Sequence, residues 1–332
     1  MALSWRLRLK LLAGRWLAAA GGALVAAFFL AARAVPYSWM AGAGGWIART
    51  LGPRLRPSRI ARANLALAFP EKSAAEREAI LRGAWDNLGR TAVEYPYLGR
   101  LWDYDPGQPA RPGRIEVAGH EHFMALRDDG RPGIVFAAHL ANWELLAVAA
   151  ARHGLDIAVL YREPNNPAIA RIIRRIRGQT MGRLIPTDLR GGLALVGVLK
   201  GGGHVGMLVD QHFSRGPLGT FFGHPVRTAP AAAKFARAFE CPLHGARVMR
   251  LPGGRFRVEV TPPLPLPPAT GDAAADEAVL TQAITDVIEG WVRERPQDWL
   301  WMHRRWRAER PAAPAGVPSA IPSAVDKPGA GR

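Results

Sequence analysis

Residues 133–138, Gly-Ile-Val-Phe-Ala-Ala, form a short and wholly apolar run that ends directly before His139. A continuous apolar run of this length is typical of a strand that is buried on both faces of a sheet. Residues 142–152 follow with helical spacing, so the chain passes from a buried strand through a short turn into a helix. In an open α/β sheet, ligands bind beyond the carboxyl ends of the strands. His139 stands at such an end and is therefore the first candidate for a functional residue.

Strand-like and helix-like segments alternate along the chain around this point, which is typical of an α/β domain. We predict further strands over residues 156–161, 204–209, 243–249 and 255–260, and helices over 167–179, 189–199, 230–240 and 276–293. Upstream, residues 39–101 have a helical pattern, with one helix over 59–69 and a second over 73–95. Past Arg310 the residues are mostly Ala, Pro, Gly and Ser, which is typical of a disordered tail.

The chain is strongly basic, because 44 of its 332 residues are Lys or Arg and 27 are Asp or Glu, giving a net charge of +17. Such a balance indicates an anionic partner: a nucleic acid, an acidic membrane surface or a phosphorylated substrate. The single cysteine, Cys241, excludes a disulfide framework and a cysteine metal site. His120 and His122 have no further ligand cluster near them, so we expect no metal ion and no tightly bound cofactor.

The N-terminal part of the chain carries much of this positive charge, since Glu71 is its first acidic residue. Residues 16–32 are uncharged and lie between arginines; as a helix they cover about 25 Å, slightly less than a bilayer core. We predict that they attach the protein to a membrane and that the arginines hold the next segment against anionic lipid. A cleaved signal peptide is the alternative, because residues 32–34 resemble a small-x-small cleavage site.

These patterns divide the chain into four parts. We expect a membrane-anchoring helix over residues 1–38, a basic helical segment over 39–105, an α/β domain over 106–310 and the tail over 311–332. Near the end of the α/β domain, tryptophans alternate with arginines, which could stack on nucleic-acid bases. Packing against the sheet or contact with a membrane interface is the favoured interpretation, and no nucleic-acid partner is expected.

The residues after the first strand read His-Leu-Ala-Asn-Trp-Glu over 139–144. If Asn142 caps the next helix, Glu144 lies in its first turn and its carboxylate can reach one imidazole nitrogen of His139. The other nitrogen would then be free to act as a general base on a hydroxyl that attacks a thioester. The alternative is structural: a histidine bonded to backbone at a strand end, and a glutamate that complements a helix N-terminus.

The run HLANWE after a buried strand resembles the His-x4-Asp/Glu signature of the lysophospholipid acyltransferase superfamily. Its glutamate variant is similar to the lipid A biosynthesis lauroyl/myristoyl acyltransferase branch. Six further segments resemble that branch in the expected order: residues 64–71, 119–123, 161–167, 208–211, 221–225 and 295–305. The resemblance implies an acyltransferase-type mixed sheet flanked by helices. Asp usually replaces Glu144 in the glycerol-phosphate acyltransferases of the superfamily, and their Phe-Pro-Glu-Gly-Thr-Arg block is absent here.

The resemblance also implies roles for individual residues. His139 would be the general base and Glu144 its partner. Asp210, which ends a predicted strand, would either orient an active-site arginine or close a turn. An arginine of residues 171–177 would complete the set, with Arg177 the first choice by spacing and Arg174 the second. Arg162 would bind substrate phosphate, although Glu163 follows it where that family more often has Pro.

The predicted helix over residues 167–179 belongs to a stretch without acids between Glu163 and Asp188. Its arginines can form an ordinary solvated basic face. They can equally grip the phosphates of a lipid headgroup or the acidic surface of an acyl carrier protein.

From the resemblance we predict an acyltransferase that moves a fatty acyl chain from acyl carrier protein to a hydroxyl of a lipid A precursor. It would act at the cytoplasmic side of a bacterial inner membrane. One alternative is an acyltransferase of the same fold that acts on a phosphatidylinositol mannoside, an ornithine lipid or a lysophospholipid. The other is a non-enzymatic, membrane-associated protein that binds anions through its basic face.

Overall fold

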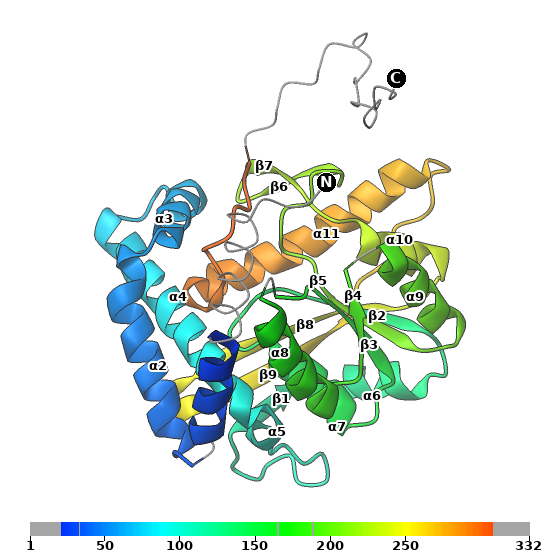
Figure 1. Cartoon of the computed structure of the whole chain (residues 1–332). Coiled ribbons are helices and arrows are strands. Elements are labelled where there is room, and N and C mark those ends of the chain that lie inside the picture. The colour runs from blue at the N-terminus through cyan, green and yellow to red at the C-terminus, as the bar shows by residue number, and fades with distance from the viewer. Residues whose placement is uncertain (1–20, 33, 165, 188, 308–332) are drawn as a thin grey trace, which may run out of the picture.

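A seven-stranded sheet forms the centre of the computed structural model, which describes residues 21–32, 34–164, 166–187 and 189–307 (Figure 1). The strand order is β1-β9-β8-β2-β5-β3-β4, and neighbouring strands are parallel except for the antiparallel pair β8 and β9. The strands are β1 (Ile115–Ala118), β2 (Gly133–Ala137), β3 (Ile157–Tyr161), β4 (Arg183–Pro186), β5 (His204–Leu208), β8 (Leu243–Leu251) and β9 (Arg255–Pro263). The expected mixed α/β sheet is confirmed.

Helices cover both faces of this sheet (Figure 1). One face carries α6 (His120–Asp128), α7 (Glu144–Arg152) and α8 (Pro167–Thr180), and the other carries α9 (Leu189–Lys200), α10 (Ala231–Ala238) and α11 (Ala273–Glu294). On the second face, the ring of Phe136 in β2 stacks on Trp291 of α11 at 5.9 Å between centroids. Both side chains are buried, so this face is a filled hydrophobic core.

Three N-terminal helices form a further layer at one end of the sheet, as the helical pattern upstream of the α/β domain predicted (Figure 1). They are α2 (Tyr37–Leu51), α3 (Pro57–Ala68) and α4 (Ala74–Glu94), and α2 packs along α4. Ser73 caps α4 in a capping box with Glu76. Short elements complete the layer and the loops: η1 (Gly52–Arg54), η2 (Tyr95–Tyr97), α5 (Leu98–Leu101), η3 (Pro252–Gly254), η4 (Pro296–Asp298) and the hairpin of β6 (Leu218–Phe221) and β7 (His224–Arg227).

The register of the two central strands decides where the functional residues meet. Ala137 of β2 pairs with Leu208 of β5 in parallel register. His139 and Asp210 each follow two residues after these partners, so both leave the sheet side by side at its carboxyl edge. This is the edge at which open α/β sheets bind ligands.

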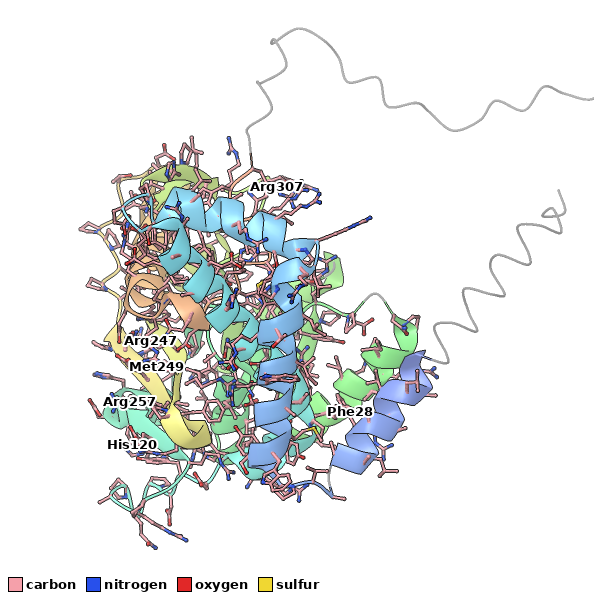
Figure 2. The ribbon with its side chains drawn as sticks, turned by 90° about the vertical axis from the view of Figure 1, so that its left-hand side faces the viewer. Phe28, His120, Arg247, Met249, Arg257 and Arg307 are labelled. Carbon is pink, nitrogen blue, oxygen red and sulfur yellow. The ribbon has the colours of Figure 1, made fainter. Side chains whose placement is uncertain are left out.

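The structure does not support the expected N-terminal membrane span: among the described residues, no helix combines the length and apolar character needed to cross a bilayer. Residues 21–32 are helical, and Figure 2, in which Phe28 is labelled, shows this helix at the edge of the molecule. It packs on α8, because a Cβ at Gly22 would come within 2.2 Å of the Cβ of Ala168. The first 20 residues and the expected tail lie outside the described residues.

Candidate active site

The loop after β2, residues 139–143, is held in place from the C-terminal side of the chain. Leu140 forms a β-bridge with Trp299. The backbone N–H of Ala141 donates to Asp298 O at 2.8 Å, and the N–H of Leu300 donates to His139 O at 3.1 Å. Ala141 has φ of 48°, a conformation that costs a non-glycine residue free energy and persists only where its surroundings hold it. These backbone bonds supply part of that restraint.

Helix α4 holds the same loop from the other side. Thr91 Oγ1 donates to the carbonyl of Ala141 at 3.1 Å, and Asn142 Nδ2 donates to Glu94 Oε2 at 2.8 Å. Glu94 in turn forms a two-fold ion pair with Arg250 of β8, at 2.6 and 3.0 Å. Since Glu94 is fully buried, this paired carboxylate has a fixed position. The loop that carries His139 is therefore held by hydrogen bonds from both sides.

His139 forms its closest side-chain contact with Asp210. The imidazole Nδ1 lies 2.7 Å from Asp210 Oδ1, and the backbone N–H of His139 donates to Oδ2 at 3.0 Å. The indole Nε1 of Trp299 also donates to Oδ2, at 2.8 Å. Burial alone would raise the pKa of Asp210, but the charge and hydrogen bonds of His139 outweigh it and hold that pKa well below its usual range. Asp210 is therefore ionised at neutral pH.

The ionised Asp210 determines which imidazole nitrogen of His139 can act as a base. Because the carboxylate can only accept, Nδ1 carries the proton of the neutral imidazole and Nε2 carries the lone pair. Nε2 lies on the side of Gln211, whose Nε2 is 3.5 Å away. His139 and Gln211 both line the cavity described below. The arrangement can accept a proton from a group bound in that cavity.

Glu144 does not take the place that we expected for it. Its carboxylate accepts from Arg177 at 2.5 and 3.0 Å, from Tyr95 Oη at 2.5 Å and from Trp143 Nε1 at 3.1 Å. The contact to the imidazole of His139 belongs to Asp210 instead. For Asp210 we considered that it orients an active-site arginine or closes a turn. Its carboxylate instead accepts hydrogen bonds from His139 and Trp299. The physical reason is that Glu144 opens α7 on the side that faces α8 and η2.

Arg177 and Glu144 form a buried ion pair that joins α8 to α7. The side chain of Arg177 is 15% exposed and that of Glu144 is 4% exposed. Burial alone would lower the pKa of Arg177, but the charge of Glu144 and the hydrogen bonds of the guanidinium to Glu144 and Tyr95 raise it above its usual value. Burial raises the pKa of Tyr95, and the charge of Glu144 adds to the effect, so its hydroxyl stays protonated and donates. Glu144 and Arg177 are thus charged partners in one hydrogen-bonded cluster.

An apolar cavity of about 450 Å³ begins at these polar residues and lies between the sheet and helices α6 and α7. Its polar lining residues include His139, Glu144, Arg162, Arg177 and Gln211. The remaining lining is mostly aliphatic, with a few aromatic side chains, and comes largely from strands β2, β3, β4, β5, β8 and β9 and from helices α6 and α7. Such a cavity suits a long hydrocarbon chain whose reactive end lies at the polar group.

Comparison with known proteins places this arrangement in a family. The family model for bacterial lipid A biosynthesis acyltransferases matches residues 10–308. This chain belongs to that family. The chain is 28% identical over 278 residues to the lipid A biosynthesis lauroyltransferase of Escherichia coli (strain K12), which covers 80% of this chain and 82% of the relative. It is 27% identical over 286 residues to the palmitoleoyltransferase of the same organism, with 82% and 86% covered.

Membership of the lipid A acyltransferase family makes the chain an acyltransferase and supports acyl transfer to lipid A. A third relative is the lipid A biosynthesis myristoyltransferase of Escherichia coli (strain K12), 24% identical over 277 residues, with 80% of each chain covered. The resemblance that we inferred from HLANWE and the six ordered segments is confirmed. The alternative of a non-enzymatic anion-binding protein is excluded with it.

Five of the six predicted site residues of this acyltransferase meet at one cavity. His139, Glu144, Arg162 and Arg177 line it, and Asp210 lies directly behind His139. Arg174, the second choice for a substrate arginine, instead forms an ion pair with Glu163 on the surface of α8, and its side chain is 53% exposed. The two arginines of one helix therefore differ in burial and in partner.

Sequence reasoning missed two residues that support the His139–Asp210 pair. Trp299 was expected to pack or to rest at a membrane interface, and its burial confirms packing. Arg305 is buried as well. Trp299 also donates to Asp210, as described above. Arg305 donates to the backbone oxygen of Gln211 at 3.1 Å, and burial lowers its pKa to about 10. Both residues lie in the segment over residues 295–305, which is one of the segments that resemble the family. That resemblance was the only feature of the sequence that could have pointed to them.

Proposed function

We propose that this enzyme transfers a fatty acyl group from an acyl carrier protein thioester to a hydroxyl of a lipid A precursor, with His139 as the general base. The observation that carries the proposal is the His139–Asp210 pair at the polar end of an apolar cavity. A buried carboxylate behind the imidazole and a hydrocarbon-sized cavity in front of it are what acyl transfer to an alcohol requires.

The reaction follows from the position of Nε2. This nitrogen takes the proton of the acceptor hydroxyl while the oxygen attacks the thioester carbonyl. The bond between the carbonyl carbon and sulfur then breaks, the acyl ester forms, and the proton on the imidazolium passes to the leaving thiolate. Asp210 stabilises the imidazolium between these steps. Gln211 carries a side-chain amide 3.5 Å from Nε2, within reach of the oxyanion that forms on the carbonyl.

The donor side of the proposal rests on the exposed face of α8. Arg171, Arg174 and Arg175 are exposed on this helix, and Arg162 is exposed near the polar end of the cavity. A cationic face beside the cavity matches the acidic surface of an acyl carrier protein better than it matches a neutral donor. The phosphates of the acceptor are the other group that these guanidinium groups can bind.

Purified wild-type enzyme in detergent is expected to transfer a myristoyl group from acyl carrier protein to a tetra-acylated lipid A precursor. The measurement is product formation by mass spectrometry, with myristoyl-coenzyme A as the matched donor. Arg171→Ala with Arg175→Ala should raise KM for the carrier-protein donor and leave KM for the coenzyme A donor much less affected. Hydrolysis of the thioester without transfer would contradict the proposed acceptor and favour another lipid, such as an ornithine lipid or a lysophospholipid.

We place the enzyme at the cytoplasmic face of a bacterial inner membrane, in contact with lipid through α2. The exposed side of this helix carries large apolar residues: Trp39 is 76% exposed, Trp46 60% and Leu51 54%. Exposed tryptophans on one helix face are typical of a membrane interface. Every charged residue between positions 21 and 70 is an arginine, which complements anionic headgroups. In Figure 2, α2 lies at the front of the molecule.

Trp39→Ala with Trp46→Ala is expected to weaken binding to vesicles that contain phosphatidylglycerol by about tenfold or more, because two aromatic side chains lose burial in lipid. The measurement is vesicle co-flotation of the full-length protein, with enzyme activity in detergent unchanged. Leu218→Ala with Val279→Ala removes two comparably exposed apolar side chains elsewhere and should leave binding unaltered. Equal weakening by both pairs of changes would contradict a specific role for α2.

A further inference from the structure

The aliphatic part of the cavity is open because small residues occupy one face of the central strands. Ala137 of β2 and Gly206 of β5 both line it, and α7 faces them with Ala147, Ala149 and Ala150. On the opposite face of the sheet, the space over Gly245 is filled, since a Cβ there would lie 2.9 Å from both Phe136 and Trp291. Gly245 thus allows close packing on one face of the sheet, whereas Gly206 leaves an open channel on the other face.

Gly206 lies in the middle of this channel. It pairs with Val135 of β2 on one side and with Val159 of β3 on the other, and all three residues line the cavity. Residues paired in a parallel sheet direct their side chains to the same face, so a side chain at position 206 would project into the cavity. Its Cβ would meet the Cδ1 atom of Ile157 at 3.1 Å, and the next nearest atoms, Ile157 Cγ1 and Val159 Cγ2, would lie at 3.7 and 3.8 Å. A Cβ at position 206 therefore fits once the end of the Ile157 side chain shifts by a few tenths of an ångström, whereas a long side chain would fill the space that an acyl chain needs.

Leu126 closes the channel further from the active site. A Cβ at Gly133, two residues before Val135, would come within 2.3 Å of the Cδ1 atom of Leu126. The backbone oxygen of Leu126 is within 2.8 Å of His204 Nε2, which ties α6 to the start of β5. Leu126 forms a buried cluster with Ala150, Leu155 and Ile157, and all four line the cavity. These four residues form the closed end of the channel, which we call its floor.

The known rise per residue of a β-strand allows the depth of these positions in the channel to be compared with the length of an acyl chain. Gly206 is level with Val135, four residues before His139, which is about 13 Å at a rise of about 3.3 Å per residue. The floor at Gly133 is six residues before His139, or about 20 Å. An extended hydrocarbon advances about 1.3 Å per carbon, as carbon–carbon bond lengths dictate, so these depths correspond to about ten and about fifteen carbons.

We propose that Gly206 sets the acyl-chain length that this enzyme accepts, by keeping the channel open past the level of Val135 down to the floor at Leu126. The inference rests on the proposed function, since it requires the acyl chain to occupy the cavity. A larger side chain at position 206 closes the channel after about ten carbons. A smaller side chain at position 126 lowers the floor. The two positions are thus expected to shift the preferred chain length in opposite directions.

The test measures kcat/KM for decanoyl, myristoyl and palmitoyl thioesters of acyl carrier protein with full-length enzyme. In Gly206→Leu the ratio of myristoyl to decanoyl transfer should fall by about 10²-fold, because each methylene that loses burial costs about fourfold. Leu126→Ala should instead raise the ratio of palmitoyl to myristoyl transfer. Gly290→Leu, at an exposed glycine of α11 with open space around it, is the matched control and should keep the wild-type ratios.

A second measurement separates this inference from the proposed function. Non-hydrolysable decyl and myristyl pantetheine thioethers should raise the melting temperature of the wild-type enzyme, the longer one more. No stabilisation by either would overturn both the proposed acyl site and the role of Gly206. A preference for the longer chain that survives in Gly206→Leu would overturn the role of Gly206 alone. If Gly206→Leu does not fold, Gly206→Ala should show a smaller shift of the same sign, and an unchanged ratio would overturn the inference.

Discussion

Replacing His139 with alanine should lower kcat for acyl transfer by about 10²–10⁴-fold, the range that a general base contributes. The loss follows because Nε2 of His139 is the nitrogen that accepts the proton of the attacking hydroxyl. Asp210 keeps two donors in this variant, the backbone N–H of residue 139 and Trp299 Nε1, so the fold should persist. The measurement is kcat by single-product mass spectrometry together with the melting temperature.

His122→Ala serves as the matched control for this prediction, because it removes a partly exposed histidine of α6 outside the cavity lining. It should leave kcat near the wild-type value. A His139→Ala enzyme that retains full activity while folded would contradict general-base catalysis at this site. A His139→Ala enzyme that does not fold would instead make the histidine structural, which was the alternative open from the sequence.

Replacing Glu144 with alanine should lower the free energy of unfolding by about 3–5 kcal/mol, as for other buried ion pairs that lose one partner. The variant leaves the guanidinium of Arg177, only 15% exposed, without its carboxylate. It also removes the acceptor of the Tyr95 hydroxyl. Urea denaturation followed by tryptophan fluorescence measures the change. We therefore expect Glu144→Ala to lose activity only to the extent that it loses the folded state.

Arg174→Ala is the matched control, since it breaks an exposed ion pair on the same helix. Removing the Arg174–Glu163 pair should cost less than about 1 kcal/mol. In addition, Glu144→Leu with Arg177→Met should recover part of the stability that Glu144→Ala loses, because no charge is then left buried without a partner. If Glu144→Ala is as stable as the wild type but inactive, Glu144 acts in catalysis and our account of its role is wrong.

The central strand and the position of His139 could be predicted because local pattern determines them. A wholly apolar run that ends in a histidine predicts a buried strand with a functional residue at its carboxyl edge, and β2 with His139 has this form. The helices α4, α7, α8 and α11 could be predicted for the same reason, since each has an apolar face at helical spacing. The mixed order of the sheet was inferred from the resemblance to a family.

The partner of His139 could not be predicted, because it depends on contacts between distant segments. Glu144 is close in sequence, but Ala141 adopts a left-handed turn that Thr91 and the 298–300 segment hold. The parallel register of β2 and β5 brings Asp210 beside His139 across 71 positions of sequence. The spacing of residues within one segment does not predict the contacts that hold Ala141, nor the contact between His139 and Asp210.

Several short elements were missed for a different reason. β1 and β4 are four-residue edge strands, and the four-residue strands β6 and β7 form a hairpin outside the main sheet. Each is too short to show a period, and tertiary pairing rather than local preference stabilises it. The nine-residue helix α6, which carries Leu126, follows Gly119 in a left-handed conformation that a pattern of apolar residues does not reveal.

The central claim is that Asp210 serves catalysis through His139, and a double-mutant cycle on kcat tests it most directly. Asp210→Asn alone should lower kcat by a factor comparable to that of His139→Ala, since the imidazole loses its orienting carboxylate. Our account predicts that Asp210→Asn costs almost nothing further in the His139→Ala enzyme, because residues that act as a unit are not additive. An additional loss in that background as large as in the wild type would show that the two residues act independently and would contradict the account.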